Sequence, residues 1–323
     1  HRDLHSFPTR RSSDLTLILL TILPSHATEA LWVENEATVE TPTGTLHGSF
    51  IRPMGESFDV VLIIAGSGPT DRNGNGPLVA TDAYGMVARA LGEAQIGSLR
   101  YDKRGIAASA AAGGREEDLR FQHFVDDALA WVDWLRAQEG VRRIFILGHS
   151  EGALVGTLAA QSGKVDGLLS VAGAGERISD GLRRQLRDGL PEGPLLDNAL
   201  ETIALLERGE PAPNANVMLY GVFRPSVQPY MMSWMPLDPA AEIAKLTVPV
   251  MIIQGSNDFQ VLVRDAELLH AGKPDAQYVL IEGMNHTLKA SEADRAAQEP
   301  TYADPTIPLH PELMGHVVGF IGK

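Results

Sequence analysis

The feature that most constrains the fold of this chain is a short apolar run that ends in a serine between two glycines. Residues 143–154 read Arg-Ile-Phe-Ile-Leu-Gly-His-Ser-Glu-Gly-Ala-Leu. The apolar run is too short for a helix, and small, helix-compatible residues follow it, so the pattern predicts a strand, a sharp turn at Ser150 and a helix. Gly148 and Gly152 would leave room for the turn. Ser150 would then project above the sheet, and the Glu151 N–H would point at whatever Ser150 attacks.

The remainder of the chain alternates between strand and helix patterns. A hairpin is expected over residues 38–51, strands at 59–64, 96–101, 167–171, 250–253 and 278–281, and helices at 79–91, 121–135, 263–270 and 311–321. Such alternation predicts an α/β fold, in which a mostly parallel sheet carries helices on both faces.

The alternation breaks between residues 177 and 246, which contain helical stretches and several prolines but no pattern of a buried strand. We interpret this segment as an inserted helical cap above the carboxyl edge of the sheet, where open α/β sheets bind ligands. Residues 28–176 and 247–323 would form the core domain. A chain of 323 residues with 44% hydrophobic content is long enough to build it.

The first 27 residues are expected to lie outside the folded domain. Residues 1–15 resemble the in-frame translation of a sequencing adapter, and we assign them no role. Residues 16–27 join an apolar run to Pro-Ser-His-Ala, which resembles the end of a signal peptide cleaved after Ala27. The alternative is a buried strand or helix. The signal-peptide interpretation predicts an exported protein.

Composition excludes several classes of function. The net charge of −14 argues against a nucleic-acid partner or an anionic membrane surface. There is no cysteine, so disulfides, thiolate metal sites and cysteine nucleophiles are excluded. No apolar run reaches the length of a membrane-spanning helix. The oligomeric state is not indicated by any pattern.

Two polar residues follow later strands and could activate Ser150. Asp258 comes after the strand at 250–253, and His286 comes after the strand at 278–281. Parallel strands end at one edge of a sheet, so the three side chains could meet there as nucleophile, base and orienting acid. Their order, Ser, Asp, His, is that of α/β-hydrolases. Other candidates for the acid are Asn257 and Glu176, and for the base His310 and His316.

From about Asp59 to its end, the chain resembles serine esterases of the α/β-hydrolase fold. Residues 66–74, Gly-Ser-Gly-Pro-Thr-Asp-Arg-Asn-Gly, are similar to a loop after the third strand in a bacterial esterase subgroup, and residues 102–105 match the Asp-x-Arg-Gly that follows the fourth strand in many members. The resemblance implies a second oxyanion donor in the first of these loops. By position this is the backbone N–H of Ser67, or else that of Gly68.

The resemblance implies a hydrolase that cleaves carboxylic esters of small molecules through Ser150, Asp258 and His286. It implies no metal and no organic cofactor. The same machinery could instead cleave thioesters, or amides if cap carboxylates such as Glu201, Glu207 and Glu210 held a substrate ammonium group. A rival of another class is a catalytically silent fold that only binds ligands.

Other polar residues near the motifs are expected to support the fold. His149 lies inside the turn and would brace it. Asp71 and Arg72 are expected to pair with each other under the oxyanion loop, and Asp102 and Arg104 to be structural.

The cap is rich in methionine and aromatic residues, which could pack the cap itself or line an acyl pocket. They are Met218, Tyr220, Phe223, Tyr230, Met231, Met232, Trp234 and Met235. We assign Met231 and Trp234 to the pocket. An apolar pocket with a closed end predicts a preference for acyl chains of about C4 to C8.

Overall fold

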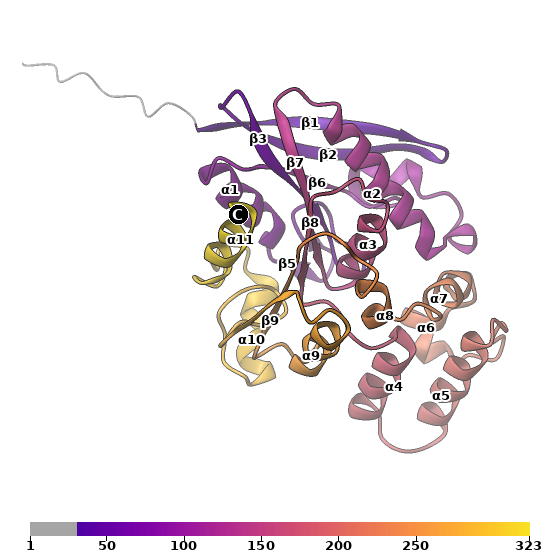
Figure 1. Ribbon diagram of the computed structural model, residues 1–323. Coiled ribbons are helices and arrows are strands. Elements are labelled where there is room, and N and C mark those ends of the chain that lie inside the picture. Colours follow the sequence, from indigo (N-terminus) through magenta and orange to yellow (C-terminus); the bar gives the residue numbers. More distant parts are fainter. Residues whose placement is uncertain (1–30) are drawn as a thin grey trace, which may run out of the picture. The chain divides into compact units, whose positions relative to one another are not determined.

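The computed structural model describes residues 31–323 (Figure 1). The interpretations of residues 1–15 and 16–27 therefore fall outside the described residues. The chain begins with the expected hairpin, formed by β1 (Trp32–Thr41) and β2 (Gly44–Pro53). It turns at Pro42-Thr43, and its strands are longer than the sequence pattern indicated.

The hairpin is the edge of an eight-stranded sheet. The other strands are β3 (Phe58–Ile64), β6 (Gly97–Tyr101), β7 (Val141–His149), β8 (Gly167–Val171), β9 (Val250–Gly255) and β10 (Gln277–Ile281). Their order is β1-β2-β6-β3-β7-β8-β9-β10, and every pair from β6 to β10 is parallel. The predicted mostly parallel sheet is confirmed.

Helices cover both faces of the sheet (Figure 1). One face carries α1 (Ala83–Glu93) and α11 (Leu313–Ile321), whose apolar side chains share a core with the sheet. The other face carries α2 (Phe121–Arg136), α3 (Glu151–Ala160) and α9 (Val263–Gly272). Strand β3 is buried along its whole length because both of its faces are covered.

Two elements differ from the sequence prediction. The helix expected over 79–91 starts only at Ala83, because Asp82 has a left-handed backbone (φ 49°) and residues 79–80 pair as β5 with β4 (Asn75–Gly76). Helix α10 (Arg295–Ala303) was not expected. It buries only Gln298 and Thr301 and contains Pro300, so it has no apolar stripe that could have revealed it.

Between β8 and β9 the regular elements are all helical. They are α4 (Ile178–Gly189), α5 (Pro194–Glu207), α6 (Tyr220–Phe223), α7 (Gln228–Trp234) and α8 (Pro239–Ile243), with 3₁₀ turns at Val217–Leu219 and Pro225–Val227. The aromatic rings of Tyr230 and Trp234 pack on Phe121 of α2, with ring centroids 6.2 and 5.2 Å apart. Residues 31–323 form one compact unit, so the cap shares its core with the domain below it.

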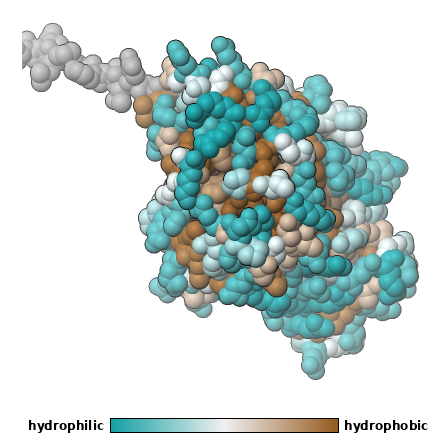
Figure 2. Space-filling view, in the orientation of Figure 1, coloured by the Kyte–Doolittle hydropathy of each residue, from teal (hydrophilic) through white to brown (hydrophobic). Residues whose placement is uncertain are grey.

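The face of the molecule in Figure 2 is largely hydrophilic, and hydrophobic side chains show between the hydrophilic ones, mostly toward its middle. Among residues 31–323, no helix is both long and apolar enough to cross a membrane.

Candidate active site

Ser150 occupies a strained turn between β7 and α3. Its backbone has φ 55° and ψ −121°, which L-residues rarely adopt. The two flanking glycines are required by close backbone approach. A Cβ at Gly148 would lie within 3.0 Å of the Gly152 carbonyl group, and a Cβ at Gly152 would meet the Ile64 carbonyl group equally closely. The predicted strand, turn and helix are therefore present, and the turn presents Ser150 to a cavity.

Asp258 and His286 form a hydrogen-bonded pair at the carboxyl ends of β9 and β10. The Asp258 Oδ2 accepts from His286 Nδ1 at 2.7 Å, while Oδ1 accepts the N–H groups of Gln260 and Val261 at 2.8 and 2.9 Å. Burial favours the protonated acid, but the His286 ring and these donors outweigh burial and hold the pKa of Asp258 below its usual value. Asp258 is thus fixed as an anion that holds the Nδ1–H of His286, which leaves Nε2 as the basic nitrogen.

His149 connects this pair to the turn and to the oxyanion loop. Its Nε2 donates to the His286 carbonyl oxygen at 2.9 Å, and its Nδ1 lies 2.8 Å from the Tyr84 hydroxyl group. Burial and the neighbouring His286 lower the pKa of His149 to about 3, so the ring is neutral and its Nδ1 accepts from Tyr84. The Tyr84 oxygen in turn accepts the Gly66 N–H at 2.9 Å. The prediction that His149 braces the turn is confirmed by these contacts.

The chain of hydrogen bonds also determines which N–H groups face the cavity. The Gly66 N–H donates to the Tyr84 hydroxyl oxygen. Within residues 31–323 the next N–H, that of Ser67, has no protein acceptor. Gly66 lies so close to Ser150 that a Cβ there would be 3.1 Å from the Ser150 Cβ. The Glu151 N–H is at the first position of α3, where no intrahelical acceptor exists. Ser67 and Glu151 can therefore both donate to an oxyanion next to Ser150.

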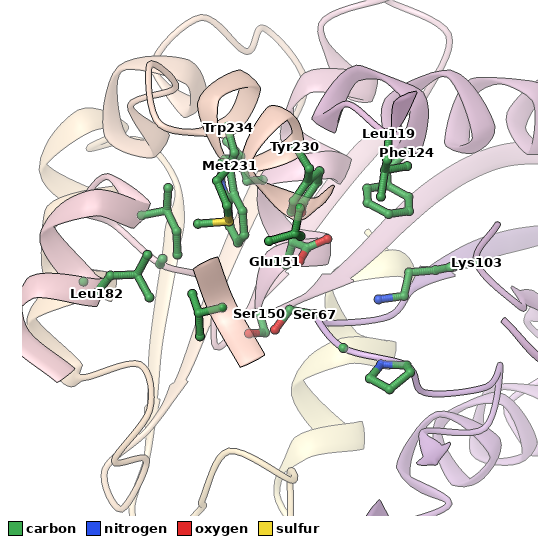
Figure 3. Close-up of a pocket in the computed structure, with 18 of the residues that line it drawn as sticks. Ser67, Lys103, Leu119, Phe124, Ser150, Glu151, Leu182, Tyr230, Met231 and Trp234 are labelled. Carbon is green, nitrogen blue, oxygen red and sulfur yellow. The ribbon is translucent and has the colours of Figure 1, made fainter. Parts of the chain in front are cut away.

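The cavity in front of Ser150 has a volume of about 920 Å³ and is roofed by the cap (Figure 3). Its walls include Ser67, Lys103, Phe124, Ser150, Glu151, Leu154, Ile178, Leu182, Val227, Tyr230, Met231 and Trp234. The assignment of Met231 and Trp234 to the cavity wall agrees with the structure. The other cap residues singled out do not line it, apart from Tyr230: Met218 is exposed, whereas Phe223 and Met235 are buried in the core.

The alternative site residues have other partners. Asn257 donates to the Ser291 carbonyl group, and Glu176 pairs with Arg184 and Arg264. Asp258 accepts a hydrogen bond from His286, and in the described part of the chain no hydrogen bond joins Asp258 to His310 or His316. The geometry therefore favours Asp258 and His286 over all four alternatives.

One expected pair is wrong. Asp71 does not pair with Arg72; its Oδ1 accepts the N–H groups of Asn73 and Asn75 and shapes the loop. Arg72 instead binds Asp102 at 2.8 Å and Glu36 at 2.9 Å. The loop is thus tied to the residues after β6 and to the hairpin, because the guanidinium group reaches across the sheet edge rather than back along its own chain.

Asp102 and Arg104 have the structural roles expected of them. Asp102 is the buried partner of Arg72, and Arg104 forms an ion pair with Asp127 of α2 in which both side chains are buried. Sequence reasoning missed Lys103 and Tyr84. Lys103 occupies the variable position of the Asp-x-Arg-Gly motif at residues 102–105, so the motif gives it no signal of its own. Tyr84 has no sequence signal beyond its place in a helical pattern.

The fold and this site define a protein of the α/β-hydrolase fold with a serine at the strained turn between β7 and α3. Residues 79–184 match the family described as serine aminopeptidase, S33. Over 280 residues the chain is 27% identical to esterase EstD of Thermotoga maritima, which covers 84% of this chain and 63% of that relative. The chain thus spans less than two thirds of the relative's length.

Solved structures share the same architecture. Est1E from Butyrivibrio proteoclasticus, in a complex with ferulic acid, superposes with a TM-score of 0.58 at 18% identity, covering 88% of this chain and 96% of that one. A bromoperoxidase from Bacillus anthracis superposes with a TM-score of 0.55 at 15% identity, covering 90% of this chain and 100% of that one. At such identities the likeness establishes the fold alone, and the two descriptions show that this fold hosts different chemistries.

Replacing Tyr84 by phenylalanine tests the hydrogen-bond chain behind the site. The change leaves the buried Gly66 N–H without its acceptor, which should cost about 1–3 kcal/mol of stability. It also releases the oxyanion loop and His149, so kcat on an ester should fall about tenfold while KM changes little. Tyr278→Phe, on β10, serves as the control. A Tyr84→Phe enzyme with normal kcat would mean that the hydrogen bonds of Tyr84 only stabilise the fold.

Proposed function

We propose that this protein is a serine hydrolase that cleaves carboxylic esters. The observation that carries the proposal is the strained Ser150 in the wall of a cavity, with the buried Asp258–His286 pair held against the same turn through His149. The likeness to esterase EstD supports the same class of reaction.

The proposed chemistry assigns one step to each of these residues. The Ser150 hydroxyl attacks the ester carbonyl carbon, and His286 Nε2 accepts its proton as the tetrahedral intermediate forms. The N–H groups of Ser67 and Glu151 stabilise the oxyanion. His286 then returns the proton to the alkoxide, which leaves as the alcohol. Water attacks the acyl-enzyme by the same route and releases the acid. Asp258 remains ionised and keeps the imidazole in the required tautomer.

The structure offers little support for amide cleavage at a free amino terminus. Such a substrate needs carboxylates placed to bind its ammonium group, and the three cap candidates do not line the cavity. Glu151 does line it, but the Lys103 charge acting on Glu151 would repel an ammonium group there. Glu207 pairs with Arg183, Glu210 pairs with Arg208, and Glu201 is exposed on α5. We therefore favour esters over aminoacyl amides, with thioesters as a variant that the same triad could cleave.

A substrate panel and a covalent probe test this proposal. We expect p-nitrophenyl esters to be hydrolysed and aminoacyl anilides to be poor substrates by at least about 10²-fold in kcat/KM. A fluorophosphonate probe should label Ser150. Hydrolysis of anilides at rates equal to esters would make the protein a peptidase, and absence of both labelling and turnover would make it a binding protein.

The cavity supports a preference for acyl chains of about C4 to C8, because its apolar walls gain about 0.8 kcal/mol per buried methylene until the chain reaches the end. Trp234→Ala enlarges the apolar side without touching the triad. The variant should shift the optimum to longer chains and change acetate-ester turnover by less than about tenfold. The measurement is kcat/KM across an ester series for both proteins. An unchanged chain-length profile would place the acyl pocket elsewhere.

We also propose that the natural precursor is exported and cleaved after Ala27, on the evidence of residues 16–27 alone. Expressed behind a basic leader, the secreted protein should begin at Thr28. Mass spectrometry of its intact amino terminus is the measurement. A mature protein that still contains residues 17–27, or that stays inside the cell, would contradict the interpretation.

A further inference from the structure

Two oppositely charged side chains lie buried in the cavity wall beside Ser150. Lys103 is 6% exposed and Glu151 is 8% exposed, and both line the cavity. The Lys103 ammonium group donates to the Gly66 carbonyl oxygen and lies over the Phe124 ring. Burial lowers the pKa of Lys103 and raises the pKa of Glu151, and the attraction between the two charges opposes both shifts. Within residues 31–323 no ion pair at 4.0 Å or less joins them.

Both side chains have unused hydrogen-bonding capacity. An ammonium group has three donors, and Lys103 uses one of them on a protein acceptor. The Glu151 carboxylate interacts with the Tyr230 hydroxyl group beside it, and no other donor to it is found among the described residues, so it can accept further hydrogen bonds (Figure 3). Buried polar groups of this kind are normally satisfied by protein, water or ligand.

The other charged groups of the cavity wall already have partners. Glu116 pairs with Arg224, Glu176 pairs with Arg184, and Arg104 pairs with Asp127. Asp265 accepts the N–H groups of Gly175 and Leu262. Lys103 and Glu151 are thus the charged pair in this wall that is best able to bind a ligand group.

The two charges select the kind of group that fits between them. A carboxylate near Lys103 would be repelled by Glu151, and an ammonium near Glu151 would be repelled by Lys103, at a depth where such repulsion is only weakly screened. A neutral hydroxyl satisfies both, because its oxygen accepts from Lys103 and its hydrogen is donated to Glu151. An apolar group there would leave the remaining donors of Lys103 and the remaining acceptors of Glu151 unsatisfied.

We propose that the substrate carries a hydroxyl group on its alcohol part, and that this hydroxyl binds between the Lys103 ammonium and the Glu151 carboxylate. The inference rests on the proposed esterase function. Figure 3 shows Lys103 on one side of Ser150 and Leu182 on the other, with Met231 and Trp234 above. Because the side of Leu182, Met231 and Trp234 suits the acyl chain, the Lys103 side is left for the alcohol. The protein would then be an esterase of hydroxylated alcohols, such as polyol or sugar esters.

Two butyrate esters of nearly equal shape test the inference. 2-Hydroxyethyl butyrate and propyl butyrate differ only in whether the alcohol ends in a hydroxyl or a methyl group. We expect the wild-type enzyme to favour the hydroxylated ester by at least about tenfold in kcat/KM, since a site built around polar groups rejects an analogue that lacks the matching group. In Lys103→Met and Glu151→Gln this ratio should fall to about two or less.

The ratio is measured within each variant, so a general loss of activity does not affect it. Lys164→Met, an exposed lysine paired with Asp133, is the matched control and should keep the wild-type ratio. Tyr230→Phe should lower the ratio by a smaller factor, because it changes the surroundings of Glu151 only. If Lys103→Met fails to fold, the Glu151→Gln ratio decides.

The outcomes separate this inference from the proposed function. Wild-type hydrolysis of both esters at equal kcat/KM, or a wild-type ratio retained in Glu151→Gln, would overturn the hydroxyl site and leave the esterase intact. Failure to hydrolyse either ester or p-nitrophenyl butyrate would overturn the esterase itself.

Discussion

Ser150→Ala and His286→Ala should each lower kcat by about 10⁶-fold on a p-nitrophenyl ester, because the nucleophile and its base act as one unit. The double variant should be no worse than either single variant. Ser150→Ala should also abolish fluorophosphonate labelling. The measurement is steady-state turnover of variants whose thermal unfolding matches that of the wild type.

His316→Ala is the matched control for the histidine, because His316 is half-buried on α11 and lies outside the cavity. It should retain activity within about twofold, as expected of a substitution away from the site. More than a few per cent of activity in His286→Ala would show that another group acts as the base, and His316 would then be the first candidate.

Asp258→Asn should be less severe than loss of the histidine, at about 10⁴-fold in kcat, because the nucleophile and base remain but the imidazole tautomer is no longer fixed. The amide keeps the shape of the side chain but can no longer accept from His286 Nδ1 as an anion does. A loss as small as about tenfold would indicate that another group orients His286.

Gly148→Ala and Gly152→Ala should destroy the nucleophile turn. Each added Cβ would lie under 3.0 Å from a backbone carbonyl oxygen that has no room to withdraw, the first at Gly152 and the second at Ile64 of β3. We expect a loss of about 3 kcal/mol of stability or failure to fold, and at least a 10²-fold loss of turnover in any protein that folds, since α3 must move away from the sheet.

Gly315→Ala provides the control for both glycines. Gly315 lies inside α11, and an added Cβ there would meet no atom within 4 Å. The change should leave turnover as it is and stabilise the helix by up to about 1 kcal/mol. Thermal unfolding and ester turnover of the three variants check the comparison. Wild-type behaviour of Gly152→Ala would contradict the tight contact between α3 and β3.

Much of the site could be predicted because its parts are local in sequence. A strand, a turn and a helix in direct succession determine the position of Ser150, and the two glycines that permit the turn are its near neighbours. Asp258 follows the buried strand β9 within a few residues, and His286 follows the partly exposed strand β10 in the same way. Because parallel strands end at one edge of a sheet, strand patterns alone predicted that these side chains would meet there.

The parts that escaped prediction depend on partners far apart in the chain. Tyr84 reaches His149 across 65 positions, and Lys103 reaches Gly66 across 37. Arg72 could have paired with the adjacent Asp71 on sequence grounds, yet it binds Asp102, just after β6, and Glu36 of β1. Such choices are made by the packing of elements against one another, which no local pattern encodes.

The sequence by itself determined the sheet, the turn at Ser150 and the positions of Asp258 and His286 after successive strands, because hydrophobic periodicity and glycine placement act over a few residues. The tertiary structure alone decided which N–H groups are free to stabilise an oxyanion, since that depends on the Tyr84 hydroxyl having taken the Gly66 N–H. It also decided what the cavity can bind. Lys103 lies after β6 and Glu151 is the first residue of α3 after β7, and only the folded sheet places both side chains beside Ser150.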